Sequence, residues 1–414
     1  MSNAQWVAIT QECDEVGDLN DVARGDGLLF VKNGVGRAGR GEVFRGTAEK
    51  ALQFLRDVSS TSEPLHSGDV LPIAFGLIPF LASEATDFIV PEVSVTKDEL
   101  GRSWVTVITQ ANTDDALVAQ HVRRVIDEVT TRVNRPQPTS SCFTVEPITP
   151  VSTYLMAVEQ ARNAVRQGDL EKVVIARDVR VSSADPIDVH SVLLRLKASF
   201  GSSYRYSVNG LVGASPELLV QVSHGIVHSN PLAGTTTRTG DSLTDEALAA
   251  ELLASAKNQI EHRVVVNMVH DTLLKWCSYL DWEPEPSVVA VANVQHLGTH
   301  VTGPLSDLTT HIYDIARNLC PTPALGGYPR DGAIALIEKI EGMRRGHYGG
   351  AVGWCDAAGN GTFAVTIRCA EFSADNKEAR LFAGGGIVAD SEPFSELAET
   401  QAKLQAMLSA IIRS

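Results

Sequence analysis

Long apolar runs, paired cysteines and clustered basic residues are all scarce in this chain. No apolar run reaches the roughly 20 residues that a membrane-spanning helix needs, so we expect no membrane segment. The six cysteines lie far apart and form no Cys-x-x-Cys pair, which favours reduced thiols. The first residues lack the charged and apolar regions of an export signal. Together these absences indicate a cytoplasmic protein.

Basic residues are outnumbered by acidic ones, and the formal net charge is −15 over 414 residues. Binding to nucleic acid or to an anionic membrane surface depends on clustered Lys and Arg, so we expect neither partner. An anionic small molecule would have to meet its own local cations. The apolar content of 44% is enough for a large core, and the length allows two or three domains or one large α/β unit.

The motifs of several large enzyme classes are also missing. The chain has no Walker A, His-Glu-x-x-His or Gly-x-Ser-x-Gly motif, which removes the P-loop, zincin and α/β-hydrolase classes. Residues 34–39 match Gly-x-Gly-x-x-Gly, but a dinucleotide-binding fold needs a helix next, and the following segment is a poor helix start. His224 with His228, and His296 with His300, are spaced by four in β-like sequence, about 13 Å apart and too far for one metal ion.

A turn-rich stretch at residues 134–141 divides the sequence. We interpret residues 1–145 as an N-terminal scaffold half that shares the core of the same fold, and residues 146–414 as the catalytic region. The second part predicts a helix over 151–167, a strand over 171–181, a β-meander over 203–230, long helical sequence over 241–280, a helix over 328–341, strands over 350–356, 361–370 and 378–383, and a terminal helix.

Three consecutive glycines, Gly384–Gly386, end an apolar strand near the C-terminus. They let backbone N–H groups approach a ligand with no Cβ in the way. The helix that follows carries Glu396, Glu399 and Lys403 on one face, because these residues are three and four apart. The combination predicts an anion and metal cradle. Three charges on a terminal helix are, taken alone, typical of an exposed face, so other segments must decide.

Three further charged residues stand beside apolar sequence. Lys172 begins an apolar strand, where partial burial would make it a base, although a strand-end lysine is more often a surface residue unless an acid faces it. Glu217 stands at the entrance of another apolar strand. Glu261 lies in the long helical sequence beside apolar residues and therefore needs a cation. Glu261 and Glu399 together would supply the one or two carboxylates that Mg²⁺ usually takes from a protein.

Nine segments, in order, resemble the chorismate-utilising enzymes and cover roughly residues 150–410. They are Glu171–Arg177, Gly213–Glu217, Pro231–Thr235, Glu261–His262, Val294–Leu297, Pro321–Arg330, Gly346–Gly350, Thr366–Arg368 and Ala383–Lys403. The resemblance implies an α/β fold of the α+β type, with two large, mainly antiparallel β-sheets flanked by helices. It also implies a Mg²⁺-dependent site for chorismate.

The resemblance implies a role for each matching residue. In family members that act through water, a lysine activates the water that attacks C2 and a glutamate protonates the departing C4 hydroxyl. These residues correspond to Lys172 and Glu217. The Mg²⁺ ligands correspond to Glu261 and Glu399, with Glu396 reached through water. The implied substrate contacts are Gly234, Thr235, His296, Ala324, Leu325, Tyr348, Arg368, Gly384 and Lys403.

Two loops favour one branch of the family. Ala233 stands where aminodeoxychorismate synthases have a nucleophilic lysine, and a methyl group cannot attack a substrate. Anthranilate synthases share this alanine but usually differ over residues 321–330, where the chain is similar to isochorismate synthases. One departure is Cys320, which stands where isochorismate synthases commonly have histidine. We therefore expect an isomerase, an isochorismate synthase.

Two alternatives remain open at this point. A salicylate synthase uses the same first step and then eliminates pyruvate. A catalytically silent paralogue that binds chorismate would leave the matched lysine and glutamates idle. We expect a monomer without an obligate glutaminase subunit. The sequence leaves open whether the product serves menaquinone, catecholate siderophore or salicylate synthesis.

Overall fold

The computed structural model describes residues 6–13, 16–61, 70–111, 113–131, 133, 142–291 and 294–413. The turn-rich stretch at residues 134–141, which we used to divide the sequence, lies outside the described residues. No helix in the described ranges combines the length and the apolar character that a membrane span needs.

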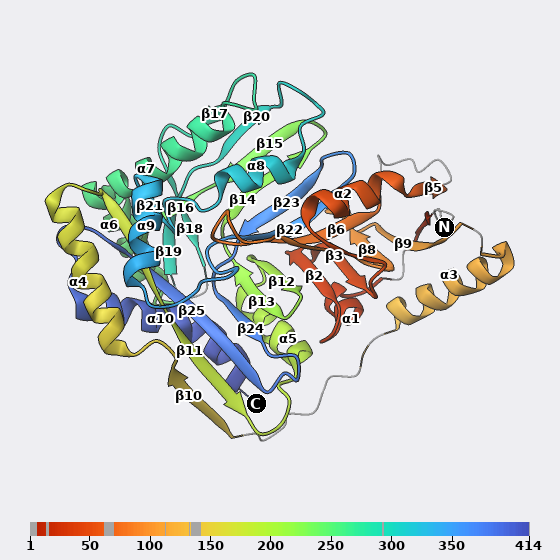
Figure 1. Cartoon of the computed structure of the whole chain (residues 1–414), viewed down its shortest axis with the longest axis horizontal. Helices are drawn as coiled ribbons and strands as arrows, with labels where there is room; N and C mark the ends of the chain where they lie inside the picture. Colours follow the sequence, from red (N-terminus) through yellow and green to blue (C-terminus); the bar gives the residue numbers. More distant parts are fainter. Residues whose placement is uncertain are drawn as a thin grey trace.

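Two large β-sheets and a small third sheet organise the chain (Figure 1). The 13-stranded first sheet runs, in spatial order, through β10 (Phe143–Pro147), β11 (Lys172–Ser183), β25 (Glu378–Ile387), β24 (Cys369–Phe372), β13 (Leu211–Ser215), β12 (Tyr204–Val208), β2 (Leu28–Lys32), β3 (Val35–Arg40), β8 (Val93–Lys97), β9 (Ser103–Gln110), β1 (Trp6–Glu12) and β5 (Ser59–Thr61), and β21 (Gly327–Tyr328) also pairs with β11.

The second sheet has nine strands and the third has three. The second runs through β17 (Asp281–Trp282), β20 (Val301–Pro304), β15 (Ile226–Asn230), β14 (Leu218–Ser223), β23 (Gly361–Val365), β22 (Ala351–Asp356), β6 (Ile73–Ile78), β7 (Asp87–Val90) and β4 (Phe44–Gly46). The third runs through β16 (Leu232–Thr237), β19 (Val294–Gly298) and β18 (Ser287–Ala290). Both large sheets contain strands from each side of residue 145.

Helices cover the sheets on their outer faces (Figure 1). They are α1 (Leu19–Ala23), α2 (Ala48–Asp57), α3 (Asp115–Thr130), α4 (Val151–Gln167), α5 (Val189–Phe200), α6 (Ser242–Ala254), α7 (Ala256–Leu273), α8 (Ile312–Leu319), α9 (Arg330–Ile340) and α10 (Pro393–Ile412). Of the strand pairs described, β1 with β5 is parallel and the rest are antiparallel. The expected α+β fold with two large, mainly antiparallel sheets is therefore confirmed.

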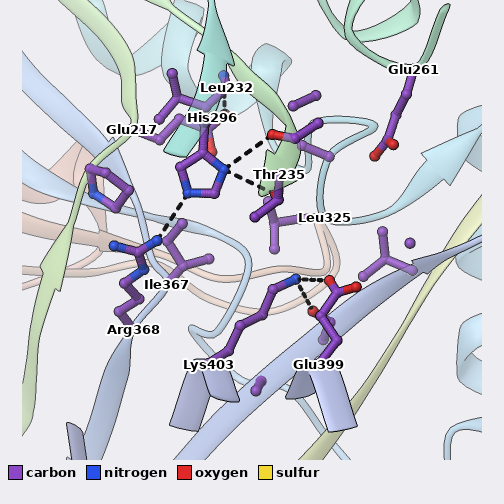
Figure 2. A pocket seen from close by; sticks show the side chains of 18 of the residues that line it. Glu217, Leu232, Thr235, Glu261, His296, Leu325, Ile367, Arg368, Glu399 and Lys403 are labelled. Carbon is purple, nitrogen blue, oxygen red and sulfur yellow. Dashed lines mark hydrogen bonds and ion pairs between the residues drawn. The ribbon is translucent and has the colours of Figure 1, made fainter. Parts of the chain in front are cut away.

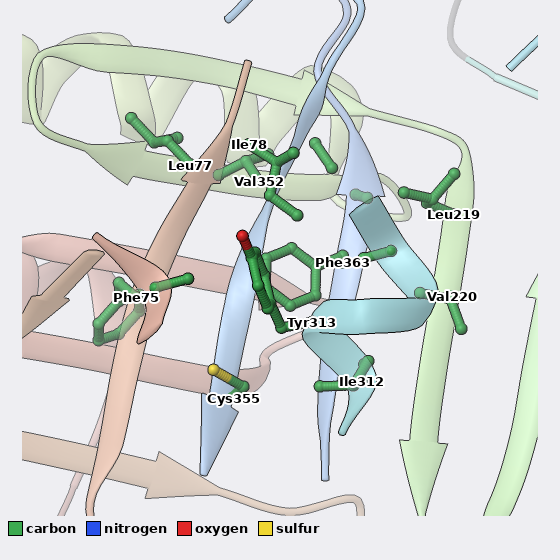
Figure 3. Close-up of a cluster of buried hydrophobic side chains, with 14 of the residues drawn as sticks. Phe75, Leu77, Ile78, Leu219, Val220, Ile312, Tyr313, Val352, Cys355 and Phe363 are labelled. Atoms are coloured by element: carbon green, nitrogen blue, oxygen red, sulfur yellow. The ribbon is translucent and has the colours of Figure 1, made fainter. Parts of the chain in front are cut away.

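The main core lies between the two large sheets and under α8. It includes Phe30 of β2 in the first sheet and Phe363 of β23 in the second. Tyr313 of α8 belongs to the same cluster and is drawn beside Phe363 in Figure 3. Side chains on a strand alternate between its faces, so Leu29 and Val31, the neighbours of Phe30, belong to a second cluster under α1, α3, α5 and α10. The first sheet is thus buried on both faces, which explains its long apolar runs.

Several elements match the sequence prediction closely. The helix expected over residues 151–167 is α4, and it ends at Gly168, whose φ of +85° is the left-handed cap that glycine favours. The strand expected over 171–181 is β11. The long helical sequence over 241–280 is divided at Ser255, which caps α7 by accepting a hydrogen bond from Asn258 N.

Two strand predictions near the C-terminus were wrong in their limits. The run over residues 361–370 is two strands, β23 and β24, because Thr366–Arg368 leaves the sheet and Arg368 adopts a φ of +50°. The glycines at 384–386 do not end a strand but lie inside β25, where they pair with Val174, Ile175 and Ala176 of β11. At these three positions β25 therefore carries no side chain on either of its faces.

Candidate active site

One cavity collects nearly all of the predicted site residues (Figure 2). It lies where β11, β25 and α10 meet β16, β19 and α7. The predicted residues that line it are Lys172, Glu217, Gly234, Thr235, Glu261, His296, Ala324, Leu325, Tyr348, Arg368, Gly384, Glu399 and Lys403. Glu396 is the predicted residue that does not line it. Lys172, at the start of β11, and Glu217, in the link between β13 and β14, therefore line the same cavity.

Lys172 is held at the start of β11 by a close ion pair. Its side chain is 9% exposed, and Nζ donates a hydrogen bond to Oε1 of Glu261 on α7 at 2.5 Å. Burial alone would raise the pKa of Glu261, but the positive charges of Lys172 and Lys403 outweigh this effect and lower it. The Glu261 carboxylate is therefore ionised, and it connects α7 to the first sheet.

Glu217 has the opposite environment. It lies between β13 and β14, is 3% exposed, and accepts a weak hydrogen bond from Leu232 N at 3.5 Å. Burial raises the pKa of Glu217 to about 8, against a smaller lowering by the Leu232 N–H and by Lys172. A carboxyl group with this pKa is mostly protonated at pH 7 and can donate a proton.

His296 links Arg368 to the small sheet (Figure 2). Arg368 Nη2 donates to His296 Nε2 at 3.0 Å, so Nδ1 carries the ring proton and can donate to Thr235 Oγ1 at 3.0 Å. Burial, together with the charges of Arg368 and Lys403, lowers the pKa of His296 to about 3, which keeps the ring neutral. Arg368 Nη1 is buried and has no hydrogen-bond partner among the described residues. It is a donor available to an anionic ligand.

Helix α10 brings a second lysine and carboxylate to the cavity (Figure 2). Lys403 Nζ lies 2.7 Å from Glu399 Oε1 and donates to Gly384 O at 2.8 Å. The two residues are four apart, which puts them on one face of the helix, as the sequence predicted. The site thus has cations at Lys172, Arg368 and Lys403 in a protein whose net charge is negative.

The carboxylates are suited to a hard divalent cation. Glu261 and Glu399 both line the cavity, whereas Glu396 lies beside Gly385 with Oε2 buried and without a partner among the described residues. Burial and the charge of Glu399 raise the pKa of Glu396. No cluster of three or more His, Cys, Asp or Glu side chains in the described ranges is arranged to hold a metal. The two carboxylates that line the cavity match the one or two that Mg²⁺ usually takes from a protein, with water and substrate completing its shell.

The glycines of β25 leave room for the charged side chains. A Cβ at Gly386 would lie 2.5 Å from Lys172 Cε, and a Cβ at Gly385 would lie 2.8 Å from Glu396 Oε2. Real side-chain atoms do not approach this closely, so any larger residue would displace these groups. The glycine run supports the predicted cradle through side-chain packing on a strand, in place of the strand end that we expected.

Apolar side chains that the sequence analysis did not single out complete the walls. Val174, Leu232, Ile367 and Phe382 line the cavity. Val174 follows Lys172 by two residues, so the alternation of a strand could have found it. Phe382 stacks on Tyr348 with ring centroids 5.2 Å apart, a long-range contact for which the sequence carries no local signal.

The family of the chain follows from a direct comparison. A family model described as "Chorismate binding enzyme" matches residues 41–412, which is most of the chain. The chain belongs to this family of chorismate-binding enzymes. The resemblance inferred from the nine segments is therefore confirmed, and it extends into the first part of the chain.

Two relatives of this chorismate-binding enzyme are both named as isochorismate synthases. Isochorismate synthase DhbC of Bacillus subtilis is 34% identical over 356 residues, which cover 83% of this chain and 82% of the relative. The putative isochorismate synthase MenF of Mycobacterium tuberculosis is 42% identical over 275 residues, which cover 63% of this chain and 74% of the relative.

Two solved structures that are named as isochorismate synthases resemble this chain in fold. The putative 2,3-dihydroxybenzoate-specific isochorismate synthase DhbC of Bacillus anthracis has a TM-score of 0.78 at 33% identity, over 95% of this chain and 98% of that chain. MenF, the menaquinone-specific isochorismate synthase of Escherichia coli, has a TM-score of 0.83 over 98% of this chain and 94% of that chain. Its identity of 23% makes it a match of fold alone.

Proposed function

We propose that this chain is an isochorismate synthase, an isomerase that converts chorismate into isochorismate. The observation that carries the proposal is that Lys172 and Glu217 line one cavity while the pKa of Glu217 is raised to about 8. A base and a protonated acid are the two groups that this reaction requires. The relatives at 34% and 42% identity carry the same activity in their names.

The cations of the cavity support binding of a dicarboxylate. Arg368 offers a buried Nη1 without a partner among the described residues, and guanidinium groups bind carboxylates in a bidentate manner. Lys403 adds a second positive charge, and its hydrogen bond to Gly384 O fixes its position. His296 stays neutral and orients Arg368. Chorismate is such a dicarboxylate, and these groups would neutralise it locally.

The chemistry divides between the two sides of the cavity. Lys172 acts as the base in its neutral amine form, and not in the ammonium form that pairs with Glu261 in the resting site: it takes a proton from water as the water oxygen bonds to C2. The Glu261 carboxylate, 2.5 Å from Nζ, stabilises the ammonium that forms. The ring double bonds shift, the C4–O bond breaks, and Glu217 gives its proton to the departing hydroxyl, which leaves as water. One water enters and one leaves, so the step is an isomerisation.

Magnesium is the cofactor that we assign to the carboxylates. Glu261 and Glu399 would hold the ion, with Glu396 reached through water. Its chemistry at this site would be to neutralise a substrate carboxylate that the negatively charged protein would otherwise repel.

We also assign separate roles to the two parts of the chain. The residues that line the cavity all come from residues 146–414, between Lys172 and Lys403. Residues 1–145 supply strands to both large sheets, which is the role of a scaffold half that shares the core. A monomer without a glutaminase subunit and a cytoplasmic location remain predictions.

The experiment is to incubate the purified protein with chorismate and Mg²⁺, with and without ammonium, and to resolve the products by chromatography. Isochorismate alone supports the proposal. Salicylate with pyruvate would indicate a salicylate synthase, and anthranilate in the presence of ammonium would indicate an anthranilate synthase. Unchanged chorismate would indicate a silent paralogue.

The Lys172→Ala variant tests the base directly. We expect it to bind chorismate but to lose turnover by about 10²–10⁴-fold, the usual contribution of a general base. Lys339→Ala is the matched control, because Lys339 is an exposed lysine on α9. Turnover of Lys172→Ala close to that of the wild type would refute the assignment.

A further inference from the structure

A buried ion pair lies directly behind the strand that carries Lys172. Glu341 follows the end of α9 and is 1% exposed, and Arg345 one turn later is 4% exposed. Arg345 Nε donates to Glu341 Oε2 at 2.8 Å, and Nη2 donates to Oε1 at 2.5 Å. The pair is bidentate and far from solvent, an arrangement that requires good geometry and further hydrogen bonds to offset desolvation.

The further hydrogen bonds are all made to main-chain atoms of β11 and of the loop that carries Leu325. Glu341 Oε1 accepts from Ala176 N at 2.7 Å. Arg345 Nη2 donates to Val174 O at 2.7 Å, and Nη1 donates to Leu325 O at 2.7 Å. Val174 and Leu325 both line the cavity. The ion pair therefore joins β11 to the loop that carries Leu325.

The ion pair occupies a gap in the first sheet. Along its outer edge β11 pairs with β21 at Lys172 and Val173, and with β10 from Val179 to Ser183. Between these two stretches, no strand of the described residues pairs with that edge. Buried backbone N–H and C=O groups need partners: here Glu341 serves Ala176 N and Arg345 serves Val174 O, while Val174 N donates to Gly326 O at 3.0 Å.

The gap lies next to Lys172, the proposed base. Val174 and Ala176 follow Lys172 by two and four residues, so all three share one face of β11. The Arg345 guanidinium also stacks on Phe80, with Cζ 4.2 Å from the ring centroid, so its plane is fixed from a second direction. A fixed plane with donors on two sides sets the spacing between β11 and the Leu325 loop.

We infer that Glu341 and Arg345 are positioning residues, which hold the Lys172 strand and the Leu325 loop at the distance that the reaction requires. This inference rests on the proposed function for its effect on turnover. Neither side chain lines the cavity, so the pair acts through Lys172 and Leu325. Small displacements of reacting groups reduce turnover strongly, by up to roughly 10²-fold for 1 Å.

The test uses the double variant Glu341→Gln/Arg345→Met, because removing Arg345 alone would leave a buried, unpaired carboxylate and could unfold the protein. The introduced glutamine keeps an acceptor for Ala176 N, whereas the introduced methionine gives up both carbonyl contacts. We expect a folded protein whose kcat falls at least tenfold, with a smaller change in KM. The single variant Arg345→Lys keeps Glu341, the positive charge and one donor direction. Its kcat should lie between those of the double variant and the wild type.

Arg344→Met is the matched control. Arg344 is adjacent in sequence, but its side chain is 86% exposed and its ion pair with Glu84 lies at the surface. Its kcat should stay within twofold of the wild type. A folded double variant whose kcat also stays within twofold, or falls only in proportion to the folded fraction, would overturn the inference.

Hydrogen exchange separates this inference from the proposed function. In the double variant, amides over residues 172–178 and 321–326 should exchange faster than in the wild type, whether or not the wild type acts on chorismate. Unchanged exchange in both segments would overturn the inference that Glu341 and Arg345 hold these two segments in place. A wild type that leaves chorismate unchanged would instead count against the proposed function alone.

Discussion

At the scale of single residues, the site depends on two carboxyl groups placed in opposite environments. Glu261 lies beside Lys172 and Lys403, which lower its pKa, whereas Glu217 is buried with little compensation and its pKa rises to about 8. The sequence predicted that both residues belong to the site. It could not predict these environments, because the partner of Glu261 is 89 positions away in the chain.

The pKa of Glu217 determines how turnover depends on pH. In the proposed mechanism Glu217 acts as an acid, so kcat should fall as pH rises through about 8 and the carboxyl group loses its proton. In Glu217→Gln, kcat should drop about 10²–10⁴-fold and the residual rate should lose this limb. A pH profile of both proteins measures the effect, and an unchanged alkaline limb in Glu217→Gln would contradict it.

The same raised pKa affects stability. A carboxyl group whose pKa is raised by folding stabilises the protein fully below the pKa of the unfolded chain, and this contribution is lost as pH rises through the folded value of about 8. The Tm of Glu217→Gln should therefore increase relative to the wild type between pH 6 and pH 9. Thermal unfolding at several pH values is the measurement.

At the scale of elements, the decisive feature is the glycine surface of β25. The sequence marked residues 384–386 as a place of close approach, which is correct, but it did not show what approaches. The glycines make room for Lys172 from β11 and Glu396 from α10, and these contacts depend on how the three elements pack. Strand limits failed at Arg368, whose φ of +50° is a left-handed conformation that an arginine in apolar β-like sequence does not signal.

Gly386→Ala tests this packing. The new Cβ would lie 2.5 Å from Lys172 Cε, and a flexible lysine side chain can move away at small cost to stability. We expect Tm to change by only a few degrees while kcat falls at least tenfold, because the displaced Lys172 Cε carries the amine that we propose as the base. Gly17→Ala, where a Cβ meets nothing within 4 Å, is the control. Equal kcat in the two variants would contradict the account.

At the scale of the whole molecule, residues on both sides of position 145 build each large sheet. In the first sheet β12 pairs with β2, and in the second β22 pairs with β6, so the two parts share their hydrogen bonds as well as their core. The motifs predicted the fold class through the family resemblance. They could not predict the strand order, because pairing between distant strands leaves no local pattern.

Shared sheets predict cooperative unfolding. We expect the full chain to melt in one calorimetric transition, with the calorimetric enthalpy equal to the van't Hoff enthalpy, because neither part can keep its strands paired alone. Two resolved transitions would show that the parts fold independently and would contradict this account of the scaffold half.

The most direct test of the central claim follows the oxygen atom. We propose that water attacks C2 and that the C4 hydroxyl leaves, with Lys172 and Glu217 on the two sides of the ring. A single turnover of chorismate with Mg²⁺ in H₂¹⁸O, analysed by mass spectrometry, should give isochorismate that is two mass units heavier, with the label at C2. Isochorismate of unchanged mass would mean that the hydroxyl moves within the substrate, and it would contradict the assignment of Lys172 as the base that activates water.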